Sequence, residues 1–310
     1  MNSPLETPVK NAPPVILPVA DAASPSKVSD VVALCKPRVT VLVWLTTLFG
    51  MVIAAGVADL HVGLALATNT LVGSLLVISS ANIFNQVIEK KPDSRMKRTR
   101  NRPIASGRIS TLEGTVLGFS AALVGLSELY FFVNPLTALL GALSIFLYAC
   151  VYTPLKPRTH LATAVGAIPG AIPPLAGWVA VTGSISAPAV FLFGLQFLWQ
   201  FPHFWAIAWL LRDDYSLAGF KMLPFPEANG TATGIAVLQY AGAVLPLSLA
   251  LSPYVAHPAV YIVGAALLGI WLVSASYKFL RSPDDPHARK VLKASIAYLP
   301  LLLLLVVCVL

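Results

Sequence analysis

The chain has 310 residues, of which 57% are hydrophobic and only 11% are charged, with a mean hydropathy of +0.78. An ordinary soluble domain contains roughly 25% charged residues, so this composition excludes a soluble globular protein and predicts a polytopic membrane protein. The formal charge of +8 is explained by membrane topology and by attraction to anionic lipid, and no nucleic-acid partner is expected.

The first 28 residues differ in composition from the rest of the chain. They contain six prolines and a few scattered charges among small residues, which cannot bury a core. We therefore expect residues 1–28 to form a disordered tail and residues 29–310 to form one transmembrane domain. The tail lacks the apolar core of a signal peptide and the Arg-rich amphipathic character of a mitochondrial transit peptide, which favours a bacterial inner membrane.

Apolar segments close to the roughly 20 residues that are needed to cross a bilayer recur along the rest of the chain. They predict an all-α polytopic membrane protein in which nine transmembrane helices form one bundle. In chain order the expected helices cover residues 39–58, 62–84, 111–133, 135–153, 161–182, 188–211, 232–252, 257–279 and 291–310.

Lysine and arginine residues lie on one side of this expected bundle. They occur in the N-terminal tail and in the connections after the second, fourth, sixth and eighth helices, whereas the other four connections contain none. The positive-inside rule therefore predicts a cytoplasmic N-terminus, an external C-terminus and a cytoplasmic face that carries the polar chemistry.

The connection after the second helix combines acidic and basic residues. Asn85, Glu89 and Asp93 recur every four residues, which would place three oxygen-bearing side chains on one helix face. Acidic residues contribute little to topology, and Mg²⁺ is commonly bound by few carboxylates together with substrate phosphate oxygens. We therefore expect Asn85, Glu89 and Asp93 to bind Mg²⁺. Pro92 is expected to end the helix near Ile88.

Basic residues suited to a diphosphate follow these candidate metal ligands. Arg98 and Arg102 lie in the same connection, and Lys156 and Arg158 lie in the connection after the fourth helix, within reach if the second and fourth helices are neighbours. Topology alone is the alternative explanation, most of all for Lys156 and Arg158. The combination of carboxylates and basic residues indicates a diphosphate that is bound with magnesium.

The sixth helix carries polar residues among aromatic ones. Trp199, Gln200 and His203 lie beside a proline in a segment rich in Trp and Phe, where burying a polar group is costly. Such a pocket suits a large flat aromatic ligand, with His203 as an axial ligand to iron or as a proton shuttle. A satisfied core histidine is the alternative. Asp213 and Asp214 follow this helix.

Three blocks of residues together form a specific pattern. They are Asn85, Gln86, Glu89, Asp93, Met96, Arg98, Thr99 and Asn101–Pro103; Tyr152–Lys156, Pro173, Pro174, Gly177 and Trp178; and Trp199, Gln200, Pro202–Phe204, Asp214, Tyr215, Ala218, Gly219 and Met222–Pro224. With these blocks the chain resembles the protohaem IX farnesyltransferases (haem O synthases), a branch of the UbiA-type intramembrane aromatic prenyltransferase superfamily. The resemblance covers nearly all of the chain after about residue 30.

The resemblance implies a nine-helix bundle whose cytoplasmic mouth binds farnesyl diphosphate through Mg²⁺. Haem b is the implied acceptor, and the implied product is haem O for haem-copper oxidases. Asn85, Glu89 and Asp93 match the first metal motif of the family, with Glu89 where Asp is usual. No redox cofactor is implied, and a haem A synthase is a candidate partner.

A second acidic motif, found in relatives that act on quinone precursors, is incomplete here. Its outer positions are Leu211 and Tyr215, which leaves Asp213 and Asp214. If the chain is a haem farnesyltransferase, we expect Asp214 to help Asn85, Glu89 and Asp93 to hold Mg²⁺.

Three other functions are weighed against haem farnesylation. A prenyltransferase for a quinone precursor would use the same cation chemistry, but the block Pro202–Phe204 argues against it. A non-catalytic haem carrier or oxidase assembly factor would need the haem pocket without the acidic motif. Magnesium-dependent release of diphosphate would therefore distinguish a farnesyltransferase from such a protein. A transporter is less favoured, because the charged residues gather at one face rather than near the membrane midplane.

Overall fold

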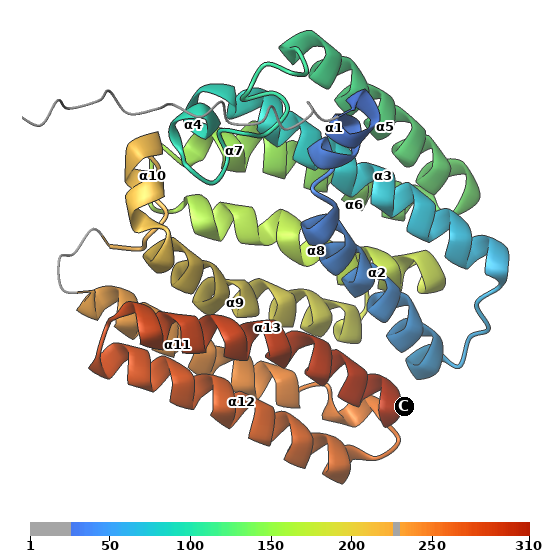
Figure 1. The fold of residues 1–310 in the computed structure, drawn as a ribbon. Helices are drawn as coiled ribbons and strands as arrows, with labels where there is room; N and C mark the ends of the chain where they lie inside the picture. Colours follow the sequence, from blue (N-terminus) through green and yellow to red (C-terminus); the bar gives the residue numbers. More distant parts are fainter. Residues whose placement is uncertain (1–25, 226–229) are drawn as a thin grey trace, which may run out of the picture.

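The computed structural model describes residues 26–225 and 230–310, and within these ranges every regular element is a helix (Figure 1). The all-α expectation is thus confirmed for the described part of the chain. Of the predicted tail, residues 1–25 lie outside the described residues. The first helix, α1 (Lys27–Leu34), includes the last two residues assigned to that tail.

Nine helical spans within the described residues are long and apolar enough to cross a membrane, which confirms the predicted number. The fourth and seventh change helix type along their length, through the π-helix η1 and the 3₁₀-helix η2. In chain order the spans are α2 (Pro37–Ala58), α3 (Leu64–Ile88), α5 (Thr111–Phe132), α6 (Pro135–Ile145) continued by η1 (Phe146–Tyr152) and α7 (Thr153–Leu155), α8 (Ala162–Thr182), α9 (Ala187–Leu210), α11 (Thr231–Leu249) with η2 (Ser252–Tyr254), α12 (Pro258–Arg281) and α13 (Asp285–Cys308).

Two short helices follow the second and sixth spans. They are α4 (Lys90–Arg95) and α10 (Arg212–Ala218), and they lie against each other at one end of the bundle (Figure 1). Helix α3 ends at Ile88, where Pro92 was expected to end it. The polar connections after α3 and α9 are therefore brought together.

Polar caps set the starts of α5 and α13, among others. The Ser110 hydroxyl accepts a hydrogen bond from the Glu113 N–H, and the Glu113 carboxylate accepts one from the Ser110 N–H, which forms a capping box at the start of α5. The Asp284 carboxylate accepts from the His287 N–H, so α13 begins at Asp285 rather than at residue 291. The hydropathy pattern placed this start too late because the first turns of α13 are charged.

Buried polar residues lie at the end of α3, which continues past residue 84, the end of the predicted apolar segment, to Ile88. The Gln86 Nε2 donates to the Leu34 carbonyl at 2.8 Å, and the Asn82 Nδ2 donates to the Thr40 hydroxyl at 3.0 Å. Both side chains are at most 5% exposed, so these bonds satisfy groups that would otherwise be costly to bury. They also tie α1 and the start of α2 to the end of α3.

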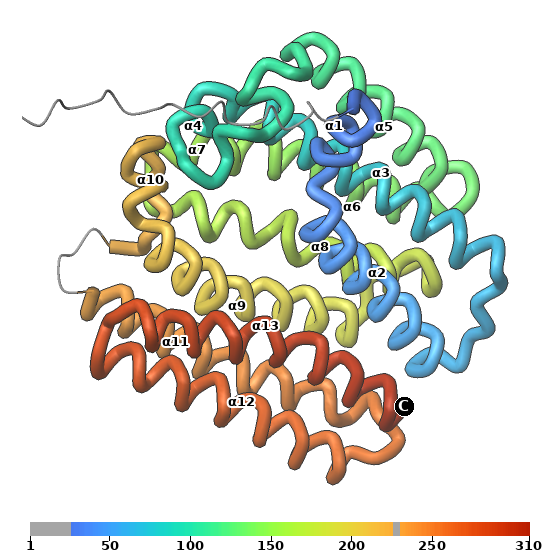
Figure 2. Tube along the Cα trace, in the orientation of Figure 1, coloured from blue at the N-terminus to red at the C-terminus, as the bar shows by residue number. Residues whose placement is uncertain are grey.

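The centre of the bundle is tightly packed. Helix α9 lies between α8 on one side and α11 and α13 on the other (Figure 2). Helices α2 and α8 approach so closely that a Cβ at Gly177 would collide with the Thr47 carbonyl, and one at Gly50 would collide with the Pro174 carbonyl. Small residues are thus required at this contact, as in other membrane helix pairs.

Candidate active site

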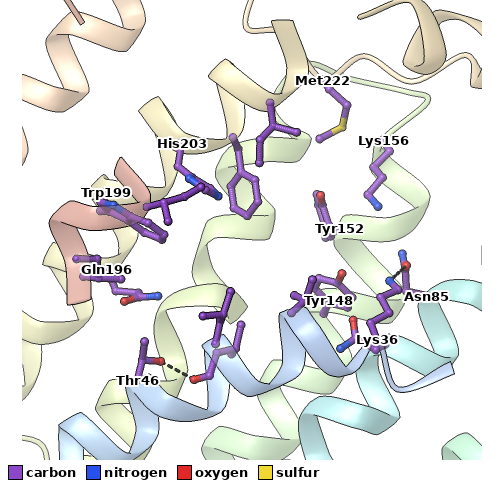
Figure 3. Close-up of a pocket in the computed structure, with 18 of the residues that line it drawn as sticks. Lys36, Thr46, Asn85, Tyr148, Tyr152, Lys156, Gln196, Trp199, His203 and Met222 are labelled. Atoms are coloured by element: carbon purple, nitrogen blue, oxygen red, sulfur yellow. Dashed lines mark hydrogen bonds between the residues drawn. The ribbon is translucent and has the colours of Figure 1, made fainter. Parts of the chain in front are cut away.

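A cavity of about 420 Å³ lies between α2, α3, η1, α9 and α13 (Figure 3). One side of it is polar and carries Lys36, Asn85 and Lys156, and the opposite side carries Trp199 and His203. Most of the residues that the sequence singled out therefore share one space, although they come from elements that are far apart in the chain.

Asn85 is held from two directions on the polar side. Its Nδ2 donates to the Thr153 hydroxyl at 3.1 Å, and this hydroxyl donates to the Tyr148 carbonyl at 2.8 Å. The Lys36 Nζ donates to the Asn85 Oδ1 at 2.6 Å. Because an ammonium has only donors, the oxygen of the amide must face Lys36.

Glu89 and Lys156 form a buried ion pair at the mouth of the same cavity. The Lys156 Nζ lies 2.6 Å from the Glu89 Oε1, and their side chains are 11% and 5% exposed, respectively. Burial by itself lowers the pKa of Lys156, but the Glu89 carboxylate together with Tyr148 and Tyr215 outweighs it, and the pKa is raised. The ammonium also lies 4.6 Å from the centre of the Tyr152 ring, a cation–π distance.

Asp93 and Arg102 form a second pair within the connection that follows α3. The Arg102 Nη1 donates to both carboxylate oxygens of Asp93, at 2.9 and 2.8 Å. Asp93 is fully buried in α4, and its backbone carbonyl accepts a hydrogen bond from the Thr99 hydroxyl at 2.9 Å. The loop that carries Arg102 is thereby folded back onto α4.

Lys36 was not expected from the sequence as a site residue. It lies between α1 and α2 with φ 50° and ψ 59°, a left-handed conformation that is uncommon for a residue with a side chain. Burial, and next the Arg102 guanidinium, lower the pKa of Lys36 to about 7. The only signal in the sequence is a single lysine directly before the proline that opens the first span.

The remaining predicted diphosphate and metal residues are less central. Arg98 lines the cavity, and its backbone N–H donates to the Asp214 Oδ2 at 3.4 Å, which links the connection after α3 to α10. Asp213 and Arg158 are exposed and do not line the cavity. Within the described ranges, no three His, Cys, Asp or Glu side chains cluster as a metal site.

The aromatic side is formed by α9 and α13. His203 and Trp199 lie one turn apart on α9 with their rings stacked, at a centroid distance of 4.8 Å and an interplanar angle of 20°. Gln200, in contrast, does not line the cavity, because its Nε2 donates to the carbonyls of Ala167 and Gln196. The cavity is lined instead by Gln196, one turn earlier on α9 (Figure 3).

Known proteins resemble the chain over most of its length. Residues 43–299 match the UbiA prenyltransferase family. A protoheme IX farnesyltransferase of Flavobacterium psychrophilum is 42% identical over 235 residues, which cover 74% of this chain and 78% of that relative.

Two solved structures resemble the fold at low sequence identity. One, a digeranylgeranylglyceryl phosphate synthase, has a TM-score of 0.76 at 16% identity and covers 91% of this chain and 98% of its own. The other is a UbiA homologue of Archaeoglobus fulgidus bound to DMAPP and Mg²⁺, with a TM-score of 0.54 at 13% identity, over 90% of this chain and 99% of that one.

Proposed function

Because the chain belongs to the UbiA prenyltransferase family, and within it to the protoheme IX farnesyltransferases, we propose that it farnesylates haem b. A farnesyl group is transferred from farnesyl diphosphate to a vinyl group of haem b, with addition of water. The product is haem O for haem-copper oxidases. The observation that carries this proposal is one cavity with three oxygen–cation pairs on one side and a histidine stacked on a tryptophan on the other. The pairs suit a diphosphate with its metal, and the stacked rings suit a flat acceptor that contains iron.

The oxygen atoms of Asn85, Glu89 and Asp93 fit a magnesium ion. All three residues are buried, line the same cavity and offer the amide and carboxylate oxygens that Mg²⁺ prefers. The Archaeoglobus fulgidus homologue bound to DMAPP and Mg²⁺ supports Mg²⁺ as the metal of the proposed reaction. When bound, the ion would place positive charge beside the diphosphate oxygens and so favour the departure of diphosphate as the leaving group. Asp214 would assist through its contact with Arg98.

Three cations already contact these oxygen atoms. Lys36, Lys156 and Arg102 come from three separate segments, and each contacts one member of the metal-binding set. Diphosphate oxygens are equivalent acceptors, so the same cations would bind them when a metal takes the carboxylates. Charge that develops on the leaving diphosphate would then meet fixed positive charge in a largely buried site, with Arg98 as a fourth contributor.

Apolar residues of α2 and α13 would surround the farnesyl chain. Leu42, Phe49 and Leu303 line the cavity, and each buried CH₂ contributes about 0.8 kcal/mol. Loss of diphosphate leaves an allylic cation at C1 of the farnesyl chain. The apolar residues exclude bulk water and so protect this cation from hydrolysis. The vinyl π electrons of haem b form the new bond to C1. Water then captures the cation beside the porphyrin and releases a proton, which leaves a hydroxyethylfarnesyl side chain.

We further propose that the polar end of the cavity faces the cytoplasm of a bacterial inner membrane, with an external C-terminus. The distribution of lysine and arginine supports this orientation, because α4, α10 and the basic connections around them share one end of the bundle. A haem A synthase, which would consume the product, is a proposed partner.

The deciding experiment supplies the full chain with haem b, farnesyl diphosphate and Mg²⁺ and analyses the haem by mass spectrometry. We expect the mass of a farnesyl group plus water, lost with EDTA and in Asp93→Ala. Glu128→Gln is a matched control, since this α5 carboxylate does not line the cavity. Prenylation of 4-hydroxybenzoate instead of haem would support a quinone-precursor enzyme, and haem binding without either product would support a haem carrier.

A further inference from the structure

Ser295 joins α13 to His203 and Trp199 of α9. Although 92 residues separate them, the Ser295 Oγ lies 3.0 Å from the His203 Nδ1. The Trp199 Nε1 donates to the Ser295 backbone carbonyl at 2.7 Å. Ser295 is fully buried and does not line the cavity, so its contacts act on the pocket through His203 and Trp199.

Counting protons at this contact favours one tautomer of the imidazole. The Ser295 hydroxyl has a single proton, and it donates to the Leu292 carbonyl at 2.8 Å. If that bond is made, the His203 Nδ1 must carry a proton and donate to the Ser295 Oγ, which gives two hydrogen bonds. The opposite tautomer allows only one, from the hydroxyl to Nδ1, and leaves the Nε2–H without an acceptor among the described residues.

The plane of the imidazole is restrained as well as its proton. The Trp199 ring stacks on His203, and the hydrogen bond from the Trp199 indole to the Ser295 carbonyl restrains that ring in turn. His203 is therefore positioned at its Nδ1 edge by Ser295 and on one face by Trp199. Figure 3 shows both side chains on the same side of the cavity.

We propose that Ser295 is a positioning residue that holds His203 as the Nδ1–H tautomer, so that the Nε2 lone pair remains available to the iron of a porphyrin in the cavity. A histidine that binds a metal commonly donates its other ring N–H to an oxygen acceptor, which fixes the tautomer and raises the basicity of the coordinating nitrogen. The assignment of iron to this nitrogen rests on the proposed function. The tautomer itself can be measured without haem.

The first test is NMR of the full chain with ¹⁵N-labelled histidine, without haem. The chain has five histidines, and the spectrum of His203→Gln assigns the His203 signals by their loss. We expect a protonated Nδ1 and an unprotonated Nε2 at His203, a mixture of tautomers in Ser295→Ala, and recovery in Ser295→Thr. Ser276→Ala is the matched control, because Ser276 is an equally buried helical serine whose hydroxyl bonds, within the described part of the chain, only to the Leu272 carbonyl. A protonated Nε2 in the unaltered chain, or no change in Ser295→Ala, would overturn the inference.

The second test is titration with ferric haem b, followed by absorption and EPR spectra. We expect Ser295→Ala to bind haem about 10- to 100-fold more weakly, as is typical when a second-sphere partner is removed, with an altered spectrum of the coordinated iron. Unchanged affinity and spectrum would contradict the assignment of iron to the positioned nitrogen. If the unaltered chain binds no haem, the proposed function fails, and the NMR result alone decides the role of Ser295.

Discussion

The Lys36 Nζ lies 2.6 Å from the Asn85 Oδ1, although 49 residues separate the two in the chain. Lys36 reaches this position because its own left-handed backbone conformation turns the chain between α1 and α2, above the end of α3. Burial and the nearby Arg102 guanidinium lower the pKa of Lys36 to about 7. The cavity therefore contains one cation whose charge changes near neutrality.

This titration predicts a pH dependence of diphosphate affinity in metal-free protein. As the pH rises through about 7, Lys36 loses its proton and its attraction for a diphosphate, so affinity for a non-hydrolysable farnesyl diphosphate analogue should fall. A fall of roughly tenfold corresponds to a charged hydrogen bond of about 1.5 kcal/mol. In Lys36→Arg the guanidinium keeps its charge, and the fall should disappear. The affinity of the unaltered chain and of Lys36→Arg for the analogue would be measured by calorimetry in EDTA at several pH values. An equal fall of affinity with pH in both proteins would contradict the role of Lys36.

The three oxygen–cation pairs predict that metal and diphosphate favour each other's binding. A divalent ion alone must compete with Lys36, Lys156 and Arg102 for its oxygen ligands, whereas a diphosphate gives these cations new partners. We expect the analogue to tighten Mn²⁺ binding, followed by EPR, by roughly 5- to 150-fold, the usual range of such coupling.

The coupling has a matched pair of variants. Lys156→Met should strengthen the binding of Mn²⁺ alone and reduce the effect of the analogue, because Glu89 is then released. Lys90→Met removes an exposed lysine of α4 whose Nζ, among the described residues, bonds only to the Thr111 hydroxyl, and it should leave the coupling intact. Equal Mn²⁺ affinity with and without the analogue in the unaltered chain would refute the exchange of partners.

The pair of Glu89 and Lys156 should also contribute to stability. Glu89→Gln leaves a buried ammonium without its carboxylate, and breaking a buried ion pair in this way costs about 3–5 kcal/mol. The double variant Glu89→Gln/Lys156→Met removes both charges and should recover part of that loss. The measurement is Tm of the full chain in detergent, and a double variant that loses the sum of the two single losses would show that the pair is not coupled.

The contact between α2 and α8 should tolerate no side chain at Gly177. A Cβ there meets the Thr47 backbone carbonyl, which cannot rotate away, so Gly177→Ala should cost about 1–3 kcal/mol of stability. Gly242 in α11 has open space at its Cβ, and Gly242→Ala should be neutral or gain about 0.5–1 kcal/mol from helix propensity. Thermal unfolding of the two variants side by side tests this, and equal Tm values would contradict the close contact.

Several features of the site were readable from the sequence because they are local. The four-residue spacing of Asn85, Glu89 and Asp93 places them along one helix and its continuation, and all three line the cavity. His203 and Trp199 share a face of α9 because four residues separate them. Gln200 follows Trp199 directly in the chain and is turned toward α8 for the same reason, which the sequence alone did not reveal.

Length and hydropathy by themselves determined that the chain is an all-α bundle with nine spans, since apolar segments of about 20 residues have the length of a membrane-spanning helix, which satisfies its own backbone within the bilayer. The spacing of polar residues also identified the acidic and aromatic segments. Only the tertiary structure decided which cation meets which oxygen, and that Ser295 meets His203, because these contacts join segments from 9 to 92 residues apart. Their distances depend on how the helices pack, and helix packing is set by side-chain shape at contacts such as Gly177 with Thr47 rather than by any local pattern.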